Sequence, residues 1–455
     1  MDMPATVLIQ QRPTPPPAPL PFFTFLRTLR TNALAMWPRA AYEQDVVRRR
    51  LLFGVNLLIN DPAAIRHVLV DNPDNYRRSH ASMRILRPIT GDGLLLSSGE
   101  AWRHQRRTIA PALAPRMLPL LSRHIAAAAE DTMAQLAATV GQPVDLLATM
   151  QTLALEIAGQ SMFSLGAGQY AAAMRPMLTE YGLSFARPTF FDMVLPPTVL
   201  TLRDRQRRRF QQRWMALIDG ILRERLRLPD TDAPRDLFDL LRAARDPETG
   251  TAFSMEELRD QVATMILAGH ETTAVTLFWS LLLLAEAPWA QERVADEAAR
   301  VDLSPEQAGA ALDRLDYTRA VVSETLRLYP PAFLLVRQAI EADRVGDLAI
   351  PRGAVVMLAP WVLHHHRKLW RDPDTFDPGR FLPDASPPAR FAYLPFGAGP
   401  RICVGAQFAM AEAVLVLAKL VQSFRIQRAS DEPVSPVAVV TTQPDHAPAF
   451  RLERR

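Results

Sequence analysis

The feature that most constrains the fold is a helix of about thirty residues in the second half of the chain. Ser254 and Glu257 match a capping box, in which a serine and a glutamate three positions later cap the start of a helix. Helical periodicity continues to about Ala287, so the helix is roughly 45–50 Å long. Its C-terminal half is apolar on nearly every side, and such a helix must pass through the core. We therefore expect the chain to fold around it.

The rest of the sequence predicts a mainly helical protein with small β-sheets at its edge. Residues from about Ala63 to Arg227 show mostly helical periodicity, interrupted by clusters of proline and glycine. A further helix is predicted over residues 406–423. Strand-like patterns occur as a small hairpin over Leu51–Ile59, turning at Gly54, and as a longer run between Ala332 and Pro360.

Length and composition fit one domain. The chain has 455 residues, of which 48% are hydrophobic, and this is enough for a large core. Prolines crowd residues 1–21, which we expect to form an extended lead-in. Residues 22–455 are expected to form a single domain.

Several classes of protein do not fit the sequence. One cysteine allows no internal disulfide, and the net charge of +4 comes without any nucleic-acid-binding motif. The N-terminus shows no secretory signal, and its longest apolar run, Val7–Ile9, is too short for a transmembrane anchor. We therefore expect a cytoplasmic monomer that does not bind nucleic acid.

The cysteine lies in a glycine-rich loop just before the helix predicted over residues 406–423. The loop reads Phe396-Gly397-Ala398-Gly399-Pro400-Arg401-Ile402-Cys403-Val404-Gly405. Glycines let main chain approach a flat ligand closely. A thiol beside a helix start is near free amides and the positive end of the helix dipole, which favour the metal-binding thiolate. These features suggest that Cys403 is a metal ligand.

The loop resembles the haem-binding signature of the cytochrome P450 family, FGxGxRxCxG, at every defined position. The resemblance implies that haem b is the cofactor and that Cys403 is the axial ligand of its iron. It also implies that Phe396 packs beside the sulfur, that Gly397 borders the haem, and that Arg401 pairs with a haem propionate. The fold would place the haem between the long helix and the cysteine loop.

A second motif, Ala268-Gly269-His270-Glu271-Thr272-Thr273, lies inside the long helix. A glycine, a carboxylate and two hydroxyls are costly in a buried helix and need an explanation. The string resembles the P450 pattern (A/G)Gx(D/E)T(T/S). The resemblance implies that Thr272 hydrogen-bonds the dioxygen being activated and that Glu271 supplies protons to it. Ala268 and Gly269 would border the cofactor.

A third resemblance concerns structural residues. Glu324 and Arg327 are three positions apart on a predicted helix and so share a face. The sequence from His364 to Phe381 resembles the P450 meander, which implies that Arg380 joins Glu324 and Arg327 in a structural network. The family often has a glutamate where this chain has Gly379. Consecutive histidines do not share a face, so His364–His366 are expected to be surface or structural residues, with no metal.

Two further arginines complete the expected propionate site. Trp102 and Arg106 are one helical turn apart and resemble the WxxxR clamp of the family. Arg337 matches another arginine that the family uses for a propionate. Buried propionates need such cationic partners.

The resemblance implies a monooxygenase that inserts one atom of O2 into a C–H or C=C bond. The sequence contains no flavin or ferredoxin module, so a separate ferredoxin and its NAD(P)H-dependent reductase are expected to supply electrons. Arg103 and Arg107 lie on another face of the helix that carries Trp102. We hypothesise that they form part of a docking patch for an acidic redox partner.

By analogy, five largely apolar segments are expected to line the substrate pocket, which favours a fatty acid, a terpenoid or another hydrocarbon. Within them, Phe190 and Phe191 are expected to roof the pocket instead of touching a membrane. The segments are residues 88–96, 185–195, 265–272, 332–336 and 439–443.

Two alternative functions remain open. The first is a peroxygenase or rearranging enzyme of the same fold that needs no electron donor, although the Glu271–Thr272 pair argues against it. The second is a haem-binding sensor or carrier without catalysis.

Overall fold

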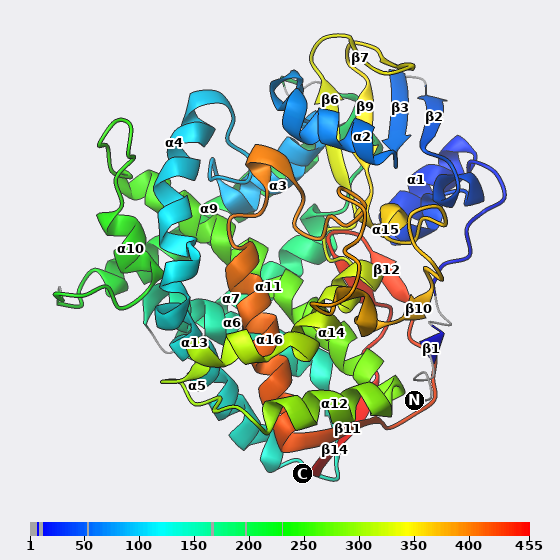
Figure 1. Ribbon diagram of the computed structural model, residues 1–455. Coiled ribbons are helices and arrows are strands. Elements are labelled where there is room, and N and C mark those ends of the chain that lie inside the picture. The colour runs from blue at the N-terminus through cyan, green and yellow to red at the C-terminus, as the bar shows by residue number, and fades with distance from the viewer. Residues whose placement is uncertain (1–6, 9–11, 52–53, 165–167, 196–197, 230) are drawn as a thin grey trace.

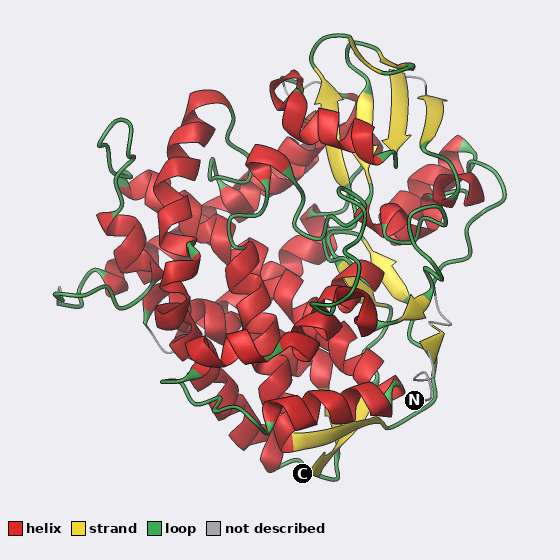
Figure 2. Ribbon diagram, in the orientation of Figure 1, coloured by secondary structure: helices red, strands yellow, loops and turns green. Residues whose placement is uncertain are grey.

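The computed structural model describes residues 7–8, 12–51, 54–164, 168–195, 198–229 and 231–455. Helices fill most of the molecule and the largest sheet lies at one edge (Figure 2), which confirms the predicted mainly helical fold with small sheets. The helices are α1 (Phe22–Thr31), α2 (Pro62–Arg66), α3 (His80–Thr90), α4 (Gly99–Ile109), α5 (Leu118–Ala137), α6 (Leu146–Phe163), α7 (Gly168–Glu180), α8 (Phe190–Val194), α9 (Leu202–Arg225), α10 (Leu237–Ala243), α11 (Met255–Glu286), α12 (Pro288–Ala298), α13 (Ala308–Ala311), α14 (Asp316–Leu328), α15 (Pro360–Leu363) and α16 (Ala406–Ser423).

The strands are short and belong to several small sheets. They are β1 (Val7–Leu8), β2 (Val46–Leu51), β3 (Gly54–Ile59), β4 (Tyr76–Arg78), β5 (Pro143–Asp145), β6 (Leu335–Ala339), β7 (Asp343–Val345), β8 (Leu348–Ile350), β9 (Val355–Leu358), β10 (Thr375–Phe376), β11 (Phe424–Arg428), β12 (Pro436–Ala438), β13 (Thr442–Pro444) and β14 (Ala449–Arg454).

Helix α11 is the central element, as its sequence predicts. The Ser254 hydroxyl accepts a hydrogen bond from the Glu257 amide at 3.2 Å, and the Glu257 carboxylate accepts one from the Ser254 amide at 2.9 Å. These bonds form the predicted capping box. The helix packs against α6, α9, α14 and α16, and every residue from 273 to 284 is buried. Figure 1 shows α16 crossing close to it in the middle of the molecule.

Within the described residues, α11 and α16 are long and apolar enough to cross a bilayer. In their most apolar windows, however, 72% and 61% of the residues are buried inside the protein. Their apolar surfaces therefore form the core of this fold.

The largest sheet has five strands in the order β2-β3-β9-β6-β4. Strands β3 and β9 are parallel and the other neighbours are antiparallel. The β2–β3 hairpin is longer than predicted, because Val46 already pairs with Ile59. Most of β2 could not be predicted, because three consecutive arginines interrupt the alternation of polar and apolar residues that is typical of a strand. The β4–β6 pairing matters for the site, since it sets Arg78 directly opposite Arg337.

Among the clusters of proline and glycine that interrupt the helical periodicity, the one over residues 88–93 does end a helix, but at Gly91 and not at Pro88. Helix α3 continues through Pro88 to Thr90 and ends at Gly91, which has a φ of +58°. Pro88 stands in the last turn, where its missing N–H removes a single helical hydrogen bond, and Gly91 then stops the helix in the left-handed region. The loop that reaches the site thus begins at Gly91.

Candidate functional site

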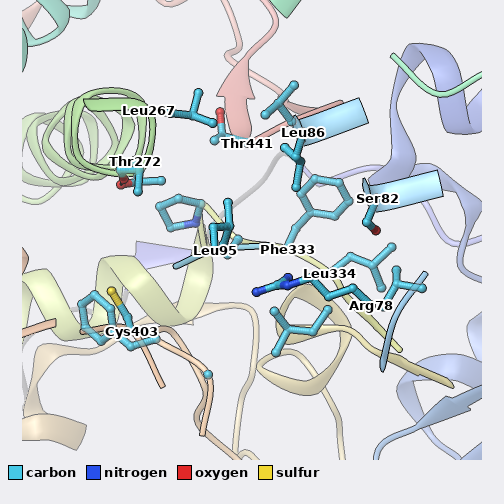
Figure 3. A pocket seen from close by; sticks show the side chains of 18 of the residues that line it. Arg78, Ser82, Leu86, Leu95, Leu267, Thr272, Phe333, Leu334, Cys403 and Thr441 are labelled. Carbon is cyan, nitrogen blue, oxygen red and sulfur yellow. The ribbon is translucent and has the colours of Figure 1, made fainter. Parts of the chain in front are cut away.

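A cavity of about 840 Å³ lies between α11, the loop before α16 and the sheet strand β6. Its walls are mostly apolar. Figure 3 shows Cys403 and Thr272 on different walls and Arg78 farther along the same space. The two motifs that are far apart in sequence therefore meet at one cavity.

Backbone contacts fix the shape of the cysteine loop. The Cys403 amide donates a hydrogen bond to the Phe396 carbonyl at 2.9 Å, which closes the loop on itself. Gly399 has a φ of +73°, and a Cβ at this position would lie 1.9 Å from the Leu69 carbonyl oxygen. Only glycine allows so close an approach of loop and neighbouring main chain. The loop then continues through Gly405 into α16.

The Cys403 thiol opens onto the cavity. Burial raises its pKa, while a hydrogen bond from the Gly405 amide and the nearby charge of Arg106 act in the opposite direction. Binding to a metal ion would deprotonate it in any case. No group of three or more His, Cys, Asp or Glu side chains that could hold a bare metal ion is found in the described part of the chain. Cys403 would thus be suited to bind a metal ion that another molecule carries.

Four arginines gather around one part of the cavity without acidic partners. The Arg106 guanidinium donates to the Ile402 carbonyl at 2.8 Å, and that of Arg401 donates to the Ser97 carbonyl at 3.0 Å. Arg401 also lies 4.4 Å from the centre of the Trp102 ring. In the described residues no carboxylate comes within ion-pair distance of the four side chains, which are Arg78, Arg106, Arg337 and Arg401.

Electrostatics shows how strongly this cluster needs an anion. Burial, followed by the charges of Arg337 and Arg401, lowers the pKa of Arg78 to about 9. Burial and Arg401 lower the pKa of Arg337 to about 10. Among the residues that the structure describes, the buried Arg78 Nε also finds no hydrogen-bond partner. Crowded buried cations are unstable unless negative charge compensates them. The thiol, the apolar walls and these cations together fit a flat metal complex with two carboxylates, which is the chemistry of haem.

Sequence reasoning found Arg106, Arg337 and Arg401 but missed Arg78. Its place in the cluster depends on the antiparallel pairing of β4 with β6, which sets it opposite Arg337. Neither Arg78 nor its neighbour Arg77 carries a local signal that separates it from a surface arginine.

The motif in α11 lines a part of the cavity wall that carries no arginine. Ala268, Gly269, Glu271 and Thr272 all line the cavity, and a Cβ added at Gly269 would meet nothing within 4 Å. The glycine therefore leaves open space above the helix. The Thr272 hydroxyl donates to the Ala268 carbonyl at 2.5 Å.

The other polar residues of the motif face different neighbours. Glu271 accepts a hydrogen bond from the Thr441 hydroxyl at 2.9 Å and another from the Gln443 amide. Burial raises the pKa of Glu271. His270 faces the Gln151 carbonyl at 3.1 Å, and burial lowers its pKa to about 4, so it is a neutral packing residue.

The structural network predicted from the sequence is present, with Glu324 and Arg327 fully buried and Arg380 partly exposed. Both oxygens of Glu324 bond Arg327 at 2.7 Å, and Arg380 lies 3.6 Å from Glu324. The amide of Asp377 also donates to Glu324 at 2.9 Å, a bond that does not need the glutamate that the family often has at Gly379. Arg327 further bonds the carbonyls of the 364–375 segment.

All three consecutive histidines are buried, and His364 has a specific task. Its Nε2 accepts a hydrogen bond from the Leu394 amide at 2.9 Å, and its Nδ1 lies 3.2 Å from the Arg327 carbonyl. Burial lowers its pKa to about 3, so the ring is neutral. Leu394 lies two residues before Phe396. His364 thus connects the Glu324–Arg327 network to the cysteine loop, a role that the sequence did not indicate.

The structure changes the interpretation of the two arginines expected to dock a redox partner. Arg103 remains 46% exposed, and its ion pairs with other described residues are those at 3.6 Å to Asp74 and 3.5 Å to Glu100. Arg107 instead bonds the fully buried Asp246 at 2.9 Å. Arg107 therefore holds α4 to Asp246, in the segment between α10 and α11, and is not a free surface cation.

All five segments expected to line the pocket contribute to the cavity wall. Phe190 lines the cavity, as expected of a pocket roof, whereas Phe191 is 56% exposed. The sequence did not predict that α1 and the part of α3 before Pro88 also line the cavity. Their side chains in the wall include Phe22, Phe25, Leu29, Ser82 and Leu86.

Comparisons with known proteins agree with this geometry. The family model of cytochrome P450 matches residues 13–447. The chain is 31% identical to the cyclooctat-9-en-7-ol 5-monooxygenase of Streptomyces melanosporofaciens, over 87% of each chain. It is 30% identical to a cytokinin hydroxylase of Arabidopsis thaliana, over 86% of this chain and 77% of that protein. The crystal structure of the cytochrome P450DA heme domain superimposes with a TM-score of 0.83 and 26% identity, covering 98% of both chains.

Proposed function

This chain belongs to the cytochrome P450 family and is a haem-dependent monooxygenase, and we propose that its substrate is a neutral, hydrophobic molecule of terpenoid type. When bound, the haem supplies the iron on which O2 is activated. The protein must hold this group, place the substrate beside it and deliver protons.

The residues of the cavity divide these tasks. Cys403 would hold the iron from the loop, and the arginine cluster would hold the two propionates. The open space at Gly269 would leave room for dioxygen beside the Thr272 hydroxyl. Glu271, half-buried one residue earlier, can carry a proton between the Thr441 side of the cavity and this space.

The observation that supports a neutral substrate is the charge of the cavity wall. Apart from the arginine cluster, the titratable groups in the described lining are Cys403, His80, Glu271 and Glu412. Burial and the neighbouring arginines lower the pKa of His80, so it is uncharged near neutral pH. A substrate carboxylate would therefore find no cation of its own, and burying it would be costly. This disfavours fatty acids.

The names of relatives support the same class. The Streptomyces relative is by name a monooxygenase of cyclooctat-9-en-7-ol, which is an alcohol and carries no charge. Another relative from that organism, 33% identical, is named cyclooctatin synthase.

The test compares neutral and acidic ligands of the same size. Purified ferric protein is titrated with terpenoid hydrocarbons and alcohols and with the matching carboxylic acids, while the Soret band reports displacement of the iron's water. We expect the neutral compounds to bind at least about tenfold more tightly, equal to about 1.4 kcal/mol. Tighter binding of the acids would contradict the proposal.

Turnover tests the reaction and its electron source. We propose that a separate ferredoxin and its NAD(P)H-dependent reductase supply electrons near Arg103 and the exposed Ile402. With 18O2, the product should gain one labelled oxygen atom. Equal turnover with hydrogen peroxide alone would favour a peroxygenase, and ligand binding without any product would favour a sensor or carrier.

A further inference from the structure

The acid of the α11 motif is tied to a distant part of the chain. The Thr441 hydroxyl donates to Glu271 Oε1 at 2.9 Å, and the Gln443 side-chain amide donates to the same oxygen. Both donors come from the turn that joins β12 to β13 and from the start of β13. The neighbouring Thr272 points its hydroxyl at the Ala268 carbonyl instead. The acid and the alcohol, adjacent in sequence, thus have separate partners.

The surroundings of Glu271 are almost uncharged. Among the described residues, no arginine, lysine or histidine forms an ion pair with it. Within the described part of the chain, the charge of Glu271 raises the pKa of Tyr181, which lies in the short π-helix η7 (Tyr181–Phe185). His270 faces α6 and is neutral. Two neutral donors therefore supply the specific stabilisation of this carboxylate, against the cost of burial.

We propose that Thr441 and Gln443 are positioning residues that hold the Glu271 carboxyl toward the β12–β13 turn and thereby control its delivery of protons to the Thr272 side of the cavity. The inference rests on the proposed role of Glu271 in the monooxygenase reaction. Neutral hydrogen bonds are weaker than a buried ion pair, so the carboxyl can leave them without a large barrier. Its second oxygen is not held by either donor.

The position of Thr441 adds a connection to the substrate. Thr441 lines the cavity together with Val439 and Val440, so a substrate that fills this end touches the residue that holds the acid. In Figure 3, Thr441 and Leu267 of α11 lie on the same side of the cavity as Thr272. The fit of the substrate at this end therefore affects how the acid is held.

The chain offers a matched set of variants. Thr441→Val and Gln443→Leu each remove one donor and keep most of the side-chain volume. Thr442→Val is the control, because the Thr442 hydroxyl lies in the same hairpin and donates to the Pro330 carbonyl at 2.7 Å, away from the acid. Glu271→Gln identifies the signal of the carboxyl group.

The first measurement needs neither substrate nor turnover. Infrared difference spectra of the ferric holoprotein, recorded across pH, follow the C=O band that Glu271→Gln abolishes. Losing a donor to the carboxylate should raise the pKa of Glu271, with a proton-binding constant about tenfold larger in Thr441→Val and in Gln443→Leu. Thr442→Val should leave the band unchanged. An unchanged midpoint in both donor variants, or an equal shift in the control, would overturn the proposal.

The second measurement separates this inference from the proposed function. In the reconstituted reaction, the pH profile of product formed per NAD(P)H should move upward with the infrared midpoint, and hydrogen peroxide should increase. If the infrared midpoint shifts but no product forms from terpenoids, the positioning role stands and the proposed substrate class is contradicted. If the infrared midpoint shifts but the pH profile of product per NAD(P)H does not change, the proposal that Thr441 and Gln443 control proton delivery is contradicted.

Discussion

Thr272 carries the hydroxyl of α11 that is closest in sequence to Glu271, and its partner in the helix is the Ala268 carbonyl. Replacing it by alanine removes this hydroxyl and leaves a residue that favours helix. We expect Thr272→Ala to retain haem but to lower product per NAD(P)H by about tenfold or more, with the electrons appearing as hydrogen peroxide. Oxidation of NAD(P)H, product and peroxide are measured together.

The control for this variant is one turn away. Thr276 also lines the cavity, and its hydroxyl donates to the Thr272 carbonyl at 2.8 Å. Thr276→Ala should therefore form nearly as much product per NAD(P)H as the unmodified protein. If Thr272→Ala formed as much product per NAD(P)H as the unmodified protein, the role assigned to Thr272 would be contradicted. An equal decrease of this ratio in both variants would contradict it as well.

His364 allows a second prediction at the level of one side chain. In His364→Leu the Leu394 amide loses its acceptor in a buried place, which costs about 1–3 kcal/mol of folding free energy. Because that amide precedes the cysteine loop, we expect a lower melting temperature and a lower ratio of haem to protein. His364→Gln can still accept a hydrogen bond and should recover part of both. Unchanged haem content in His364→Leu would show that the connection to the loop is unimportant.

At the scale of elements, the loop from Gly91 to Ser97 is fastened to the first half of α11. The Asp92 amide donates to Asp260 at 2.8 Å, and the Leu94 amide donates to Gln261 at 2.9 Å. Leu94 and Leu95 of this loop line the cavity. The same helix thus carries the Thr272 motif and fixes one wall of the substrate space.

Gly93 makes this attachment testable. A Cβ at Gly93 would lie 2.2 Å from the Thr264 hydroxyl and 2.7 Å from the Asp260 carbonyl, so Gly93→Ala must push the loop off α11. We expect a fold that still binds haem but a dissociation constant for the best substrate at least about tenfold larger, measured by the Soret shift. Gly220→Ala in α9, where a Cβ meets nothing within 4 Å, is the control and should bind normally. Normal affinity in Gly93→Ala would show that the loop adapts.

Elements with local signals were predictable from the sequence. The capping residues Ser254 and Glu257 marked the start of α11, and the helix predicted over residues 406–423 matches α16. The pair Glu324 and Arg327 was visible because a helix brings such neighbours onto one face. Motif spacing likewise indicated Cys403 and the Glu271–Thr272 pair.

Features that depend on distant contacts were not predictable. Arg78 joins the arginine cluster only through the pairing of β4 with β6, and Gln443 reaches Glu271 only through the packing of the C-terminal hairpin. The wall formed by Phe22 and Phe25 depends on how α1 packs. Nothing in a short window of sequence fixes such contacts, since they follow from tertiary structure.

At the scale of the whole molecule, charge determines how a partner approaches. The chain has 52 basic and 48 acidic residues, so local clusters matter more than net charge. Helix α4 lies beside the cysteine loop, to which Arg106 connects it, and it presents Arg103 to solvent. An acidic ferredoxin would meet Arg103 close to the exposed Ile402. Arg107 is unsuitable for testing this, because replacing it would remove the only arginine that pairs with the buried Asp246 among the described residues, leaving His104 beside this carboxylate.

Charge reversal at Arg103 tests the docking surface without disturbing the core. Rim charges act mainly on association rate and on its salt dependence. We expect Arg103→Glu to raise the KM for an acidic ferredoxin several-fold at low salt while kcat with saturating ferredoxin changes little. Added salt should shrink the difference, because exposed charges are screened beyond about 8 Å at physiological ionic strength. Arg352→Glu, with a side chain 75% exposed in the turn between β8 and β9, changes net charge equally and should leave KM unaltered. The same KM in both variants would place the docking surface elsewhere.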